Sequence, residues 1–202
     1  MAGKFAQPQK PKGIDLQLQM KILVVRFSSI GDIVLTTPVL RCLKQQLPNA
    51  EIYYATKASY TQLLQSNPYI NGVVTLGKDW SQFMAEVKQH RFDLIVDLHN
   101  NLRTRRMKLR LPWVPFYRFK KANFRKWLLV RHVIKTPVKH VVHRYMETVN
   151  HLGVQYDGEG LDFFGVAETL PCSLPDKFTA YAMGGTWATK RMPLNKMEEL
   201  IY

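Results

Sequence analysis

With 202 residues, the chain can hold one complete domain and part of a second. Hydrophobic residues make up 46% of it, enough for a sizeable buried core, and its two cysteines are too few for a disulfide framework. No apolar run is long enough to cross a bilayer, and residues 1–19, rich in Gln, Pro and Lys, lack the apolar stretch of a signal peptide. We therefore expect a disordered leader over residues 1–19 and a cytoplasmic or peripheral protein.

The formal net charge of +14 is concentrated in one part of the chain. Residues 100–146 contain no Asp or Glu but 14 Lys and Arg residues, as many as the net charge of the whole chain. A solvated basic surface usually has acids between its cations, so we expect an anionic partner for this stretch. Phosphorylated lipid, a membrane surface or nucleic acid would fit.

Short β-branched runs alternate with helical patterns from residue 20 to about residue 170. Such alternation predicts a parallel α/β sheet with right-handed crossovers. The expected strands cover residues 21–26, 51–56, 72–76, 92–98 and, as a candidate, 114–119. The expected helices follow the loop at 27–31 as far as about residue 47 and then cover 59–65, 80–90 and 140–152, with 120–139 unassigned. Pro38 predicts either the first turn of a helix or a kink.

A second domain is predicted to begin near residue 177. Residues 171–176 have the composition of a linker, and a strand at 178–183, a loop at 184–193 and a helix to the chain end follow. One strand and one helix cannot bury an apolar face on their own. We therefore expect residues 20–170 to form the N-terminal domain and residues 177–202 to be the first β-α unit of a truncated second domain.

The loop after the first strand, Ser28 to Asp32, is a candidate ligand site. Ligands of parallel α/β sheets bind at the carboxyl ends of the strands, Gly31 permits close approach of the backbone, and the start of the following helix favours anions. Neither GxGxxG nor GxxxxGKS/T is present, which argues against a nucleotide fingerprint. Asp32 is either a functional carboxylate or an acid that caps the helix.

The loop at residues 184–191 also follows a predicted strand and precedes a predicted helix. Its two glycines, two threonines and two cations suit a phosphate or diphosphate, although a loop with solvated cations has the same composition. Two such loops, on two α/β units, indicate a ligand cleft between domains.

Three segments resemble the family 9 glycosyltransferases, the lipopolysaccharide heptosyltransferases. The opening of that family is similar to KILVVRFSSIGDIVLTTPVLRCLKQQLP, its strand-loop segment with two aspartates to FDLIVDLHNNLRTRRM, and its second-domain G-x-x-W-x-x-K-R-W-P signature to AMGGTWATKRMPLNKMEELI. The matches occur in order from about residue 20 to the chain end. Met192 stands where the family commonly has Trp.

The resemblance implies a GT-B architecture, in which two Rossmann-like domains hold the active site between them. It implies inverting, metal-independent transfer of heptose from ADP-heptose to an anionic lipid A–core acceptor in lipopolysaccharide biosynthesis, at the inner face of the cytoplasmic membrane. Asp32 matches the family's catalytic aspartate, a base for the acceptor hydroxyl. The donor diphosphate would be bound by Ser28, Ser29, Gly31, Gly185, Thr186, Thr189 and Lys190.

The acceptor is expected on the first domain. Arg103, Arg105 and Arg106 come shortly after the fourth predicted strand, and His140 and Arg144 match a His-x-x-x-Arg of the family, although either could cap or pair locally. The sequence has no Asp-x-Asp pair and no cluster with metal-ligand spacing, so neither a metal nor another cofactor is predicted.

Two other functions are compatible with the residues. A GT-B transferase specific for another nucleotide sugar would share the pattern, because the residues that select base and sugar lie mainly in the second domain. A nucleic-acid-binding module has no RNP, KH or zinc-knuckle pattern here and is not expected under the resemblance, but it would use the aromatics between the cations: Trp113, Phe116, Tyr117, Phe119, Phe124 and Trp127. Without most of the second domain, we expect the 202 residues alone to be inactive.

Overall fold

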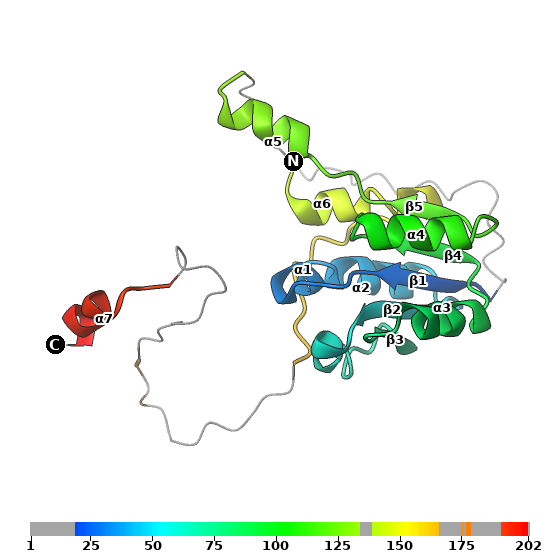
Figure 1. The fold of residues 1–202 in the computed structure, drawn as a ribbon, viewed down its shortest axis with the longest axis horizontal. Coiled ribbons are helices and arrows are strands. Elements are labelled where there is room, and N and C mark those ends of the chain that lie inside the picture. The colour runs from blue at the N-terminus through cyan, green and yellow to red at the C-terminus, as the bar shows by residue number, and fades with distance from the viewer. Residues whose placement is uncertain (1–18, 134–138, 166–174, 176, 179–190, 202) are drawn as a thin grey trace, which may run out of the picture. The chain divides into compact units, whose positions relative to one another are not determined.

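The computed structural model describes residues 19–133, 139–165, 175, 177–178 and 191–201. The chain divides into two units, Met1–Val166 and Ala167–Tyr202, and each is described by itself. The first contains one parallel sheet of five strands in the order β3-β2-β1-β4-β5, with helices on both faces (Figure 1). The parallel α/β architecture predicted from the sequence is confirmed.

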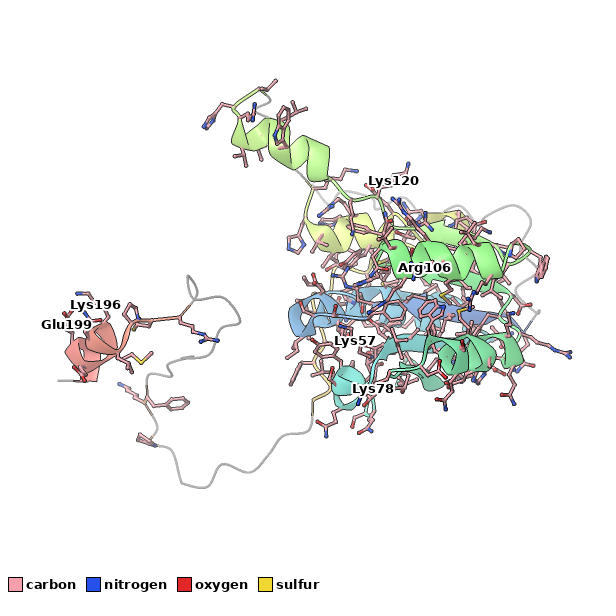
Figure 2. All side chains as sticks on the ribbon, viewed as in Figure 1. Lys57, Lys78, Arg106, Lys120, Lys196 and Glu199 are labelled. Atoms are coloured by element: carbon pink, nitrogen blue, oxygen red, sulfur yellow. The ribbon has the colours of Figure 1, made fainter. Side chains whose placement is uncertain are left out.

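Each strand lies where the sequence predicts one. The central strand is β1, whose Val24 pairs with Tyr54 on one side and with Val96 on the other. Because all the strands are parallel, their carboxyl ends meet at one edge, and Lys57 and Lys78, labelled in Figure 2, lie at the ends of two of them. The strands are β1 (Lys21–Val25), β2 (Glu51–Lys57), β3 (Gly72–Leu76), β4 (Leu94–Asp97) and β5 (Phe116–Arg118).

The single helix predicted after β1 is two helices. The first, α1 (Ile30–Val34), ends at a turn, and the second, α2 (Thr37–Gln46), has Pro38 as its second residue. The Thr36 hydroxyl donates a hydrogen bond to the Ile33 carbonyl at 2.6 Å within that turn. Pro38 therefore lies in a first helical turn, where its missing N–H is not needed.

The other predicted helices are present, with two differences in type and length. The helix predicted over residues 59–65 is a 3-10 helix that ends at Leu63, and the helix predicted over residues 140–152 ends at Met146 and is followed by a separate 3-10 turn. The observed elements are η1 (Ala58–Leu63), α3 (Trp80–Gln89), α6 (Val141–Met146) and η2 (Asn150–Leu152).

Two further helices are not predicted from the sequence, α4 (Leu102–Arg110) and α5 (Asn123–Val130). Five of the nine residues of α4 are Lys or Arg, so its apolar period is weak. The helix starts at Asn101, whose side-chain oxygen accepts from the Thr104 N–H at 3.0 Å, while the Thr104 hydroxyl accepts from the Asn101 N–H at 3.0 Å. This reciprocal pair satisfies two backbone donors that the helix leaves free at its start.

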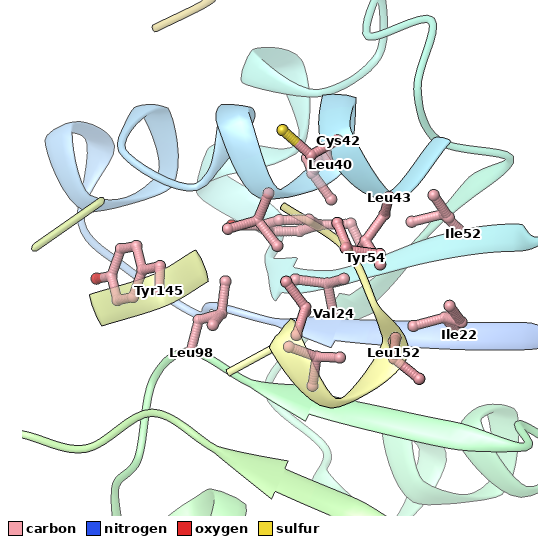
Figure 3. Packing of buried hydrophobic residues seen from close by; sticks show 14 of the residues in the cluster. Ile22, Val24, Leu40, Cys42, Leu43, Ile52, Tyr54, Leu98, Tyr145 and Leu152 are labelled. Atoms are coloured by element: carbon pink, nitrogen blue, oxygen red, sulfur yellow. The ribbon is translucent and has the colours of Figure 1, made fainter. Parts of the chain in front are cut away.

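Each face of the sheet has its own buried layer. In β1, Ile22 and Val24 face the layer of α2 and α6, whereas Leu23 and Val25 face the layer of α3 and α4. All four side chains are fully buried, as a central strand covered on both faces requires. Figure 3 shows the first layer, in which Cys42 packs as an apolar residue, and burial raises the pKa of its thiol to about 11.

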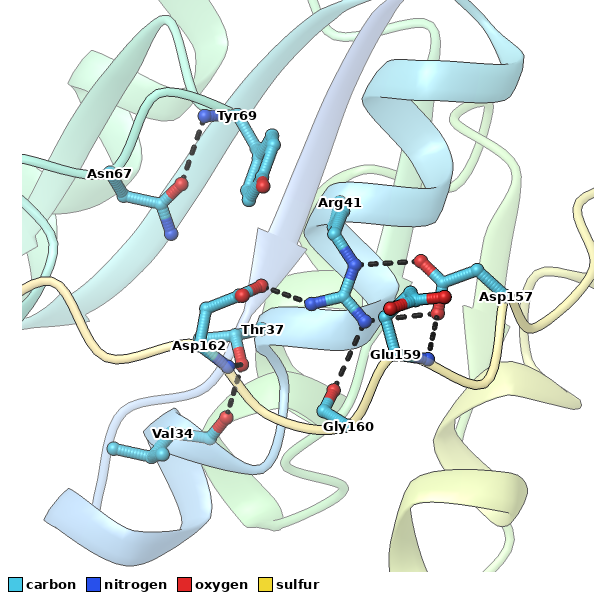
Figure 4. A network of polar contacts seen from close by, with 9 residues as sticks. All are labelled: Val34, Thr37, Arg41, Asn67, Tyr69, Asp157, Glu159, Gly160 and Asp162. Atoms are coloured by element: carbon cyan, nitrogen blue, oxygen red, sulfur yellow. Dashed lines mark hydrogen bonds and ion pairs between the residues drawn. The ribbon is translucent and has the colours of Figure 1, made fainter.

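The segment after η2, residues 154–165, is fastened to α2, and we call it the exit segment. Arg41 of α2 is only 4% exposed and bonds Asp157 at 2.6 and 2.9 Å and the Gly160 carbonyl at 3.0 Å (Figure 4). It also pairs with Asp162, whose N–H donates to the Thr37 hydroxyl at 2.9 Å. The exit segment is therefore fixed to α2 by a buried guanidinium with two carboxylate partners.

The second unit is described only in part. Its helix α7 (Leu194–Ile201) coincides with the predicted one and contains an ion pair between Lys196 and Glu199 at 2.7 Å. The strand predicted at 178–183 and most of the loop after it lie outside the described residues.

Candidate active site

Asp32 lies at the edge where the strands end, as the third residue of α1. Its side chain is 38% exposed and accepts from the Ser29 hydroxyl at 3.1 Å and from the Ser29 N–H at 3.4 Å, while Arg26 Nη2 lies 2.5 Å from the same oxygen, Oδ2. Burial raises the pKa of the Asp32 carboxyl, but the Arg26 charge and the Ser29 hydrogen bonds outweigh it, so the pKa lies below the ordinary 3.8. Asp32 is therefore an ionised, accessible carboxylate as well as a local helix-start acceptor.

Arg26 orients Asp32, and sequence reasoning missed it. It is the first residue after β1, and it donates to the Ser28 carbonyl at 2.8 Å and to the Leu98 carbonyl at 2.7 Å. Its third contact is the Asp32 carboxylate. The guanidinium thus joins the loop after β1, the end of β4 and α1. Its position directly after a buried strand is the signal that would have found it.

Neither steric crowding by the described residues nor the backbone conformation requires a glycine at position 31. A Cβ at this position would meet nothing within 4 Å, and the residue does not have a positive φ. The backbone beside Asp32 therefore presents an open surface. Ser28 and Ser29, the other residues of this loop predicted to contact the donor, bond Arg26 through a carbonyl and Asp32 through a hydroxyl.

A cationic cavity of about 530 Å³ opens at the ends of β2 and β3. It is lined by Lys57 of β2, Lys78 of the loop between β3 and α3, and Arg103 of α4, and Trp80 contributes an aromatic wall. Within the described part of the chain, none of these three cations has a carboxylate within ion-pair distance. Sequence reasoning found Arg103 but missed the two lysines, although both stand at strand ends.

The three arginines predicted to bind the acceptor all lie on α4, but only one of them lines the cavity. Arg103, near the start of the helix, lines the cavity, whereas Arg105 and Arg106 are exposed on the outer side of the helix. The difference is one of position along the helix. Arg103 lies in the first turn, nearest the strand ends, whereas Arg105 and Arg106 lie further along and face away from the inward-pointing Thr104 and Met107.

His99 lies among the charges of this edge. Burial, together with the charges of Arg26, Lys121 and Lys57, lowers the pKa of its imidazole to about 4, and the Asp32 charge opposes the shift. The ring is therefore neutral at pH 7. It packs edge-on against Phe27 at 5.4 Å, and its Nδ1 is buried without a hydrogen-bond partner among the residues described.

His140 and Arg144 make local contacts. His140 is the N-cap of α6, and its Nδ1 accepts from the Val142 N–H at 3.4 Å. Arg144 donates to the Lys139 carbonyl at 3.2 Å and lies over the Phe119 ring at 5.0 Å. Both side chains therefore make the local capping or pairing contacts that the sequence allowed as an alternative, and neither is buried.

The predicted donor residues of the second domain, Gly185, Thr186, Thr189 and Lys190, lie outside the described residues. Over the ranges that are described, no group of three or more His, Cys, Asp or Glu side chains could hold a metal ion. None of the helices in those ranges has the length and apolarity to span a membrane.

Comparison with known proteins finds relatives of one kind, although no protein-family model matches the sequence. The chain is 21% identical over 204 residues to lipopolysaccharide heptosyltransferase 1 of Pseudomonas aeruginosa, in a match that covers 90% of this chain and 57% of that protein. Its fold is similar to the crystal structure of a family 9 glycosyltransferase from Veillonella parvula, with a TM-score of 0.66, 19% identity, and coverage of 90% of this chain and 59% of that one.

The fold is also similar to E. coli heptosyltransferase WaaC. The TM-score is 0.56 for its structure with ADP, at 19% identity, over 71% of this chain and 50% of that one. It is 0.50 for the structure with ADP-2-deoxy-2-fluoro heptose, at 20% identity, over 71% of this chain and 51% of that one. The predicted similarity to the family 9 glycosyltransferases and the Rossmann-like fold are confirmed, and the chain spans a little over half the length of these relatives.

Proposed function

From the likeness to family 9 glycosyltransferases, we propose that the protein is an inverting, metal-independent GT-B transferase that moves heptose from ADP-heptose to an anionic lipid A–core acceptor. Residues 20–170 would bind the acceptor, residues 171–176 would link the domains, and residues 177–202 would begin the nucleotide-sugar domain. Because the chain spans 57% of its curated relative, the activity is proposed for the whole protein. The observation that carries the proposal is the ionised, accessible Asp32 at the strand-end edge, which also holds a cavity whose cations have no carboxylate partner among the described residues.

Asp32 acts as the base in this proposal. An acceptor hydroxyl that attacks the anomeric carbon must lose its proton, and a positioned carboxylate that receives it contributes about 10²- to 10⁴-fold to the rate. The low pKa keeps Asp32 ionised at neutral pH, and Arg26 holds it in one orientation. Since Arg26 stabilises the carboxylate, it also weakens the base, so its role is to position the group rather than to strengthen it.

The donor is proposed from the relatives. Solved structures of WaaC contain ADP and a fluorinated ADP-heptose, and an ADP-sugar is the donor we carry over to this chain. The departing diphosphate gains negative charge, which backbone N–H groups, hydroxyls and a lysine can stabilise. We assign this role to the open loop after β1 and to the second-domain loop: Ser28, Ser29, Gly31, Gly185, Thr186, Thr189 and Lys190.

The acceptor's anionic groups are proposed to enter the cavity of Lys57, Lys78 and Arg103. Phosphates and acidic sugars are the chemistry that unpaired cations from separate elements recognise, since charge-assisted hydrogen bonds are about twice as strong as neutral ones. His140 and Arg144 remain candidates for the same acceptor from α6. The enzyme would work as a peripheral protein on the inner face of the cytoplasmic membrane, where the lipid acceptor is anchored.

The test replaces Asp32 by Asn in the longest form of the protein that contains these residues. We expect Asp32→Asn to lower kcat for ADP release by about 10²- to 10⁴-fold, with little change in KM for ADP-heptose. The variant should keep the fold by circular dichroism, with a lower unfolding temperature because the Arg26 ion pair is lost. The matched control is Asp93→Asn at the opposite edge of the sheet, where Asp93 accepts from the Lys21 N–H. Turnover retained in Asp32→Asn would reject the assignment of the base.

A further inference from the structure

The outer side of α4 combines exposed apolar and cationic side chains. Leu102 and Leu109 are 72% and 80% exposed, whereas Thr104 and Met107 are buried against the sheet. Leu102 and Leu109 are seven residues apart, two helical turns, and therefore lie on the same side, directly away from the core. Trp113, just after the helix, is 82% exposed.

Arginines flank these leucines, and no acid balances them. Arg105, Arg106 and Arg110 are exposed, and Figure 2 shows Arg106 on α4. No carboxylate among the described residues lies within ion-pair distance of the three. The sequence has no Asp or Glu between residues 98 and 146, so no acid close in sequence can pair with them.

The combination fits a lipid surface better than other anionic partners. Each exposed leucine would gain free energy if an apolar phase covered it. At a bilayer surface, Leu and Trp enter the boundary between headgroups and acyl chains while arginines bond lipid phosphates. Nucleic acid would engage the arginines through phosphates and Trp113 by stacking, but it offers two aliphatic side chains no partner.

We propose that the outer face of α4 docks the protein on an anionic lipid bilayer. The docking face consists of Leu102, Arg105, Arg106, Leu109, Arg110 and Trp113. The same combination of exposed apolar and cationic side chains occurs at α5, where Val130 is 77% exposed and Arg131 lies over the Trp127 ring at 4.4 Å. The inference deepens the proposed function, because α4 begins at the edge that holds Asp32, but it rests on the residues of α4 and not on the chemistry of transfer.

The experiment is flotation of the protein with vesicles made of equal parts of phosphatidylcholine and phosphatidylglycerol, compared with phosphatidylcholine alone. We expect binding to the anionic vesicles only. Leu102→Asn with Leu109→Asn should weaken it by at least about tenfold. Arg105→Gln and Arg110→Gln should each weaken it about fivefold, since a basic residue near the surface contributes about 1 kcal/mol. Leu161→Asn, an exposed leucine outside α4, is the control and should bind normally.

Three results would overturn the docking face: equal binding of the double leucine variant, equal binding to neutral vesicles, or competition by an oligonucleotide that the leucine substitutions do not affect. The last would make α4 a nucleic-acid surface. Docking and transfer are separable, because the leucine variant should keep its turnover of a short, water-soluble acceptor. If that turnover is absent from the parent protein while the vesicle results hold, the proposed function fails and the docking face stands.

Discussion

Arg41 and the arginines of α4 lie in opposite layers of the same sheet, in contrasting environments. Arg41 is buried and bonds two carboxylates and a carbonyl, whereas Arg103, Arg105 and Arg106 have no carboxylate partner in the part of the chain that is described. A guanidinium that leaves water must be paired, because an isolated buried charge is prohibitively unfavourable. An arginine that stays in water without a partner contributes nothing comparable to the fold. The contrast shows that Arg41 stabilises the fold, whereas the arginines of α4 are available to bind another molecule.

The largest expected effect is the loss of stability when the buried Arg41 is replaced. Arg41→Met should lower the free energy of unfolding by about 3–5 kcal/mol, because it leaves Asp157 and Asp162 beside an apolar side chain. Urea unfolding followed by circular dichroism measures it. The matched control, Arg106→Met, should change stability by less than about 0.5 kcal/mol. Equal losses of unfolding free energy in the two variants would show that Arg41 does not stabilise the fold more than Arg106.

A second, smaller effect appears at low pH. The hydrogen bond from Arg41 lowers the pKa of Asp157 to about 2, against opposition from burial, while its ordinary value is 3.8. Because the folded pKa lies below the unfolded one, the ion pair stabilises the fold above about pH 4 and is lost as the pH falls toward 2. Unfolding free energies between these values should fall more steeply in the parent than in Arg41→Met. The same slope in both would show that Asp157 does not depend on Arg41.

The fold could be predicted because the spacing of apolar residues in its strands and helices is regular. β1 and β4 are short apolar runs that a sheet covered on both faces requires, and their positions were found within two residues. The start of α4 was missed because five cations in nine residues conceal an inward side of only two fully buried residues. Without that helix, it could not be predicted that Arg103 lines the cavity while Arg106, one turn further along α4, does not.

The site could be predicted only where one local rule was applied. Loops and helix starts that follow strands gave Asp32 and Arg103, and attention to the strand ends themselves would have given Arg26, Lys57 and Lys78. The role of Arg41 has no such signal. Its carboxylate partners are 116 and 121 residues away in the sequence, so the pairing exists only after the exit segment has packed on α2.

The smallest expected effect is on substrate binding, at the unpaired cations of the cavity. Lys57→Met and Lys78→Met should each raise KM for the acceptor at least about tenfold, since a hydrogen bond to a charged group contributes about 1.5–3 kcal/mol. KM for ADP-heptose should stay unchanged. Initial rates with each substrate varied in turn measure both constants. Lys88→Met, an exposed lysine of α3 that does not line this cavity, is the control. Because neither lysine has an ion pair with a described residue, the stability of the two variants should match the parent's. A change in unfolding would indicate a structural role like that of Arg41. A parallel rise in both KM values would instead show that the cavity does not distinguish acceptor from donor.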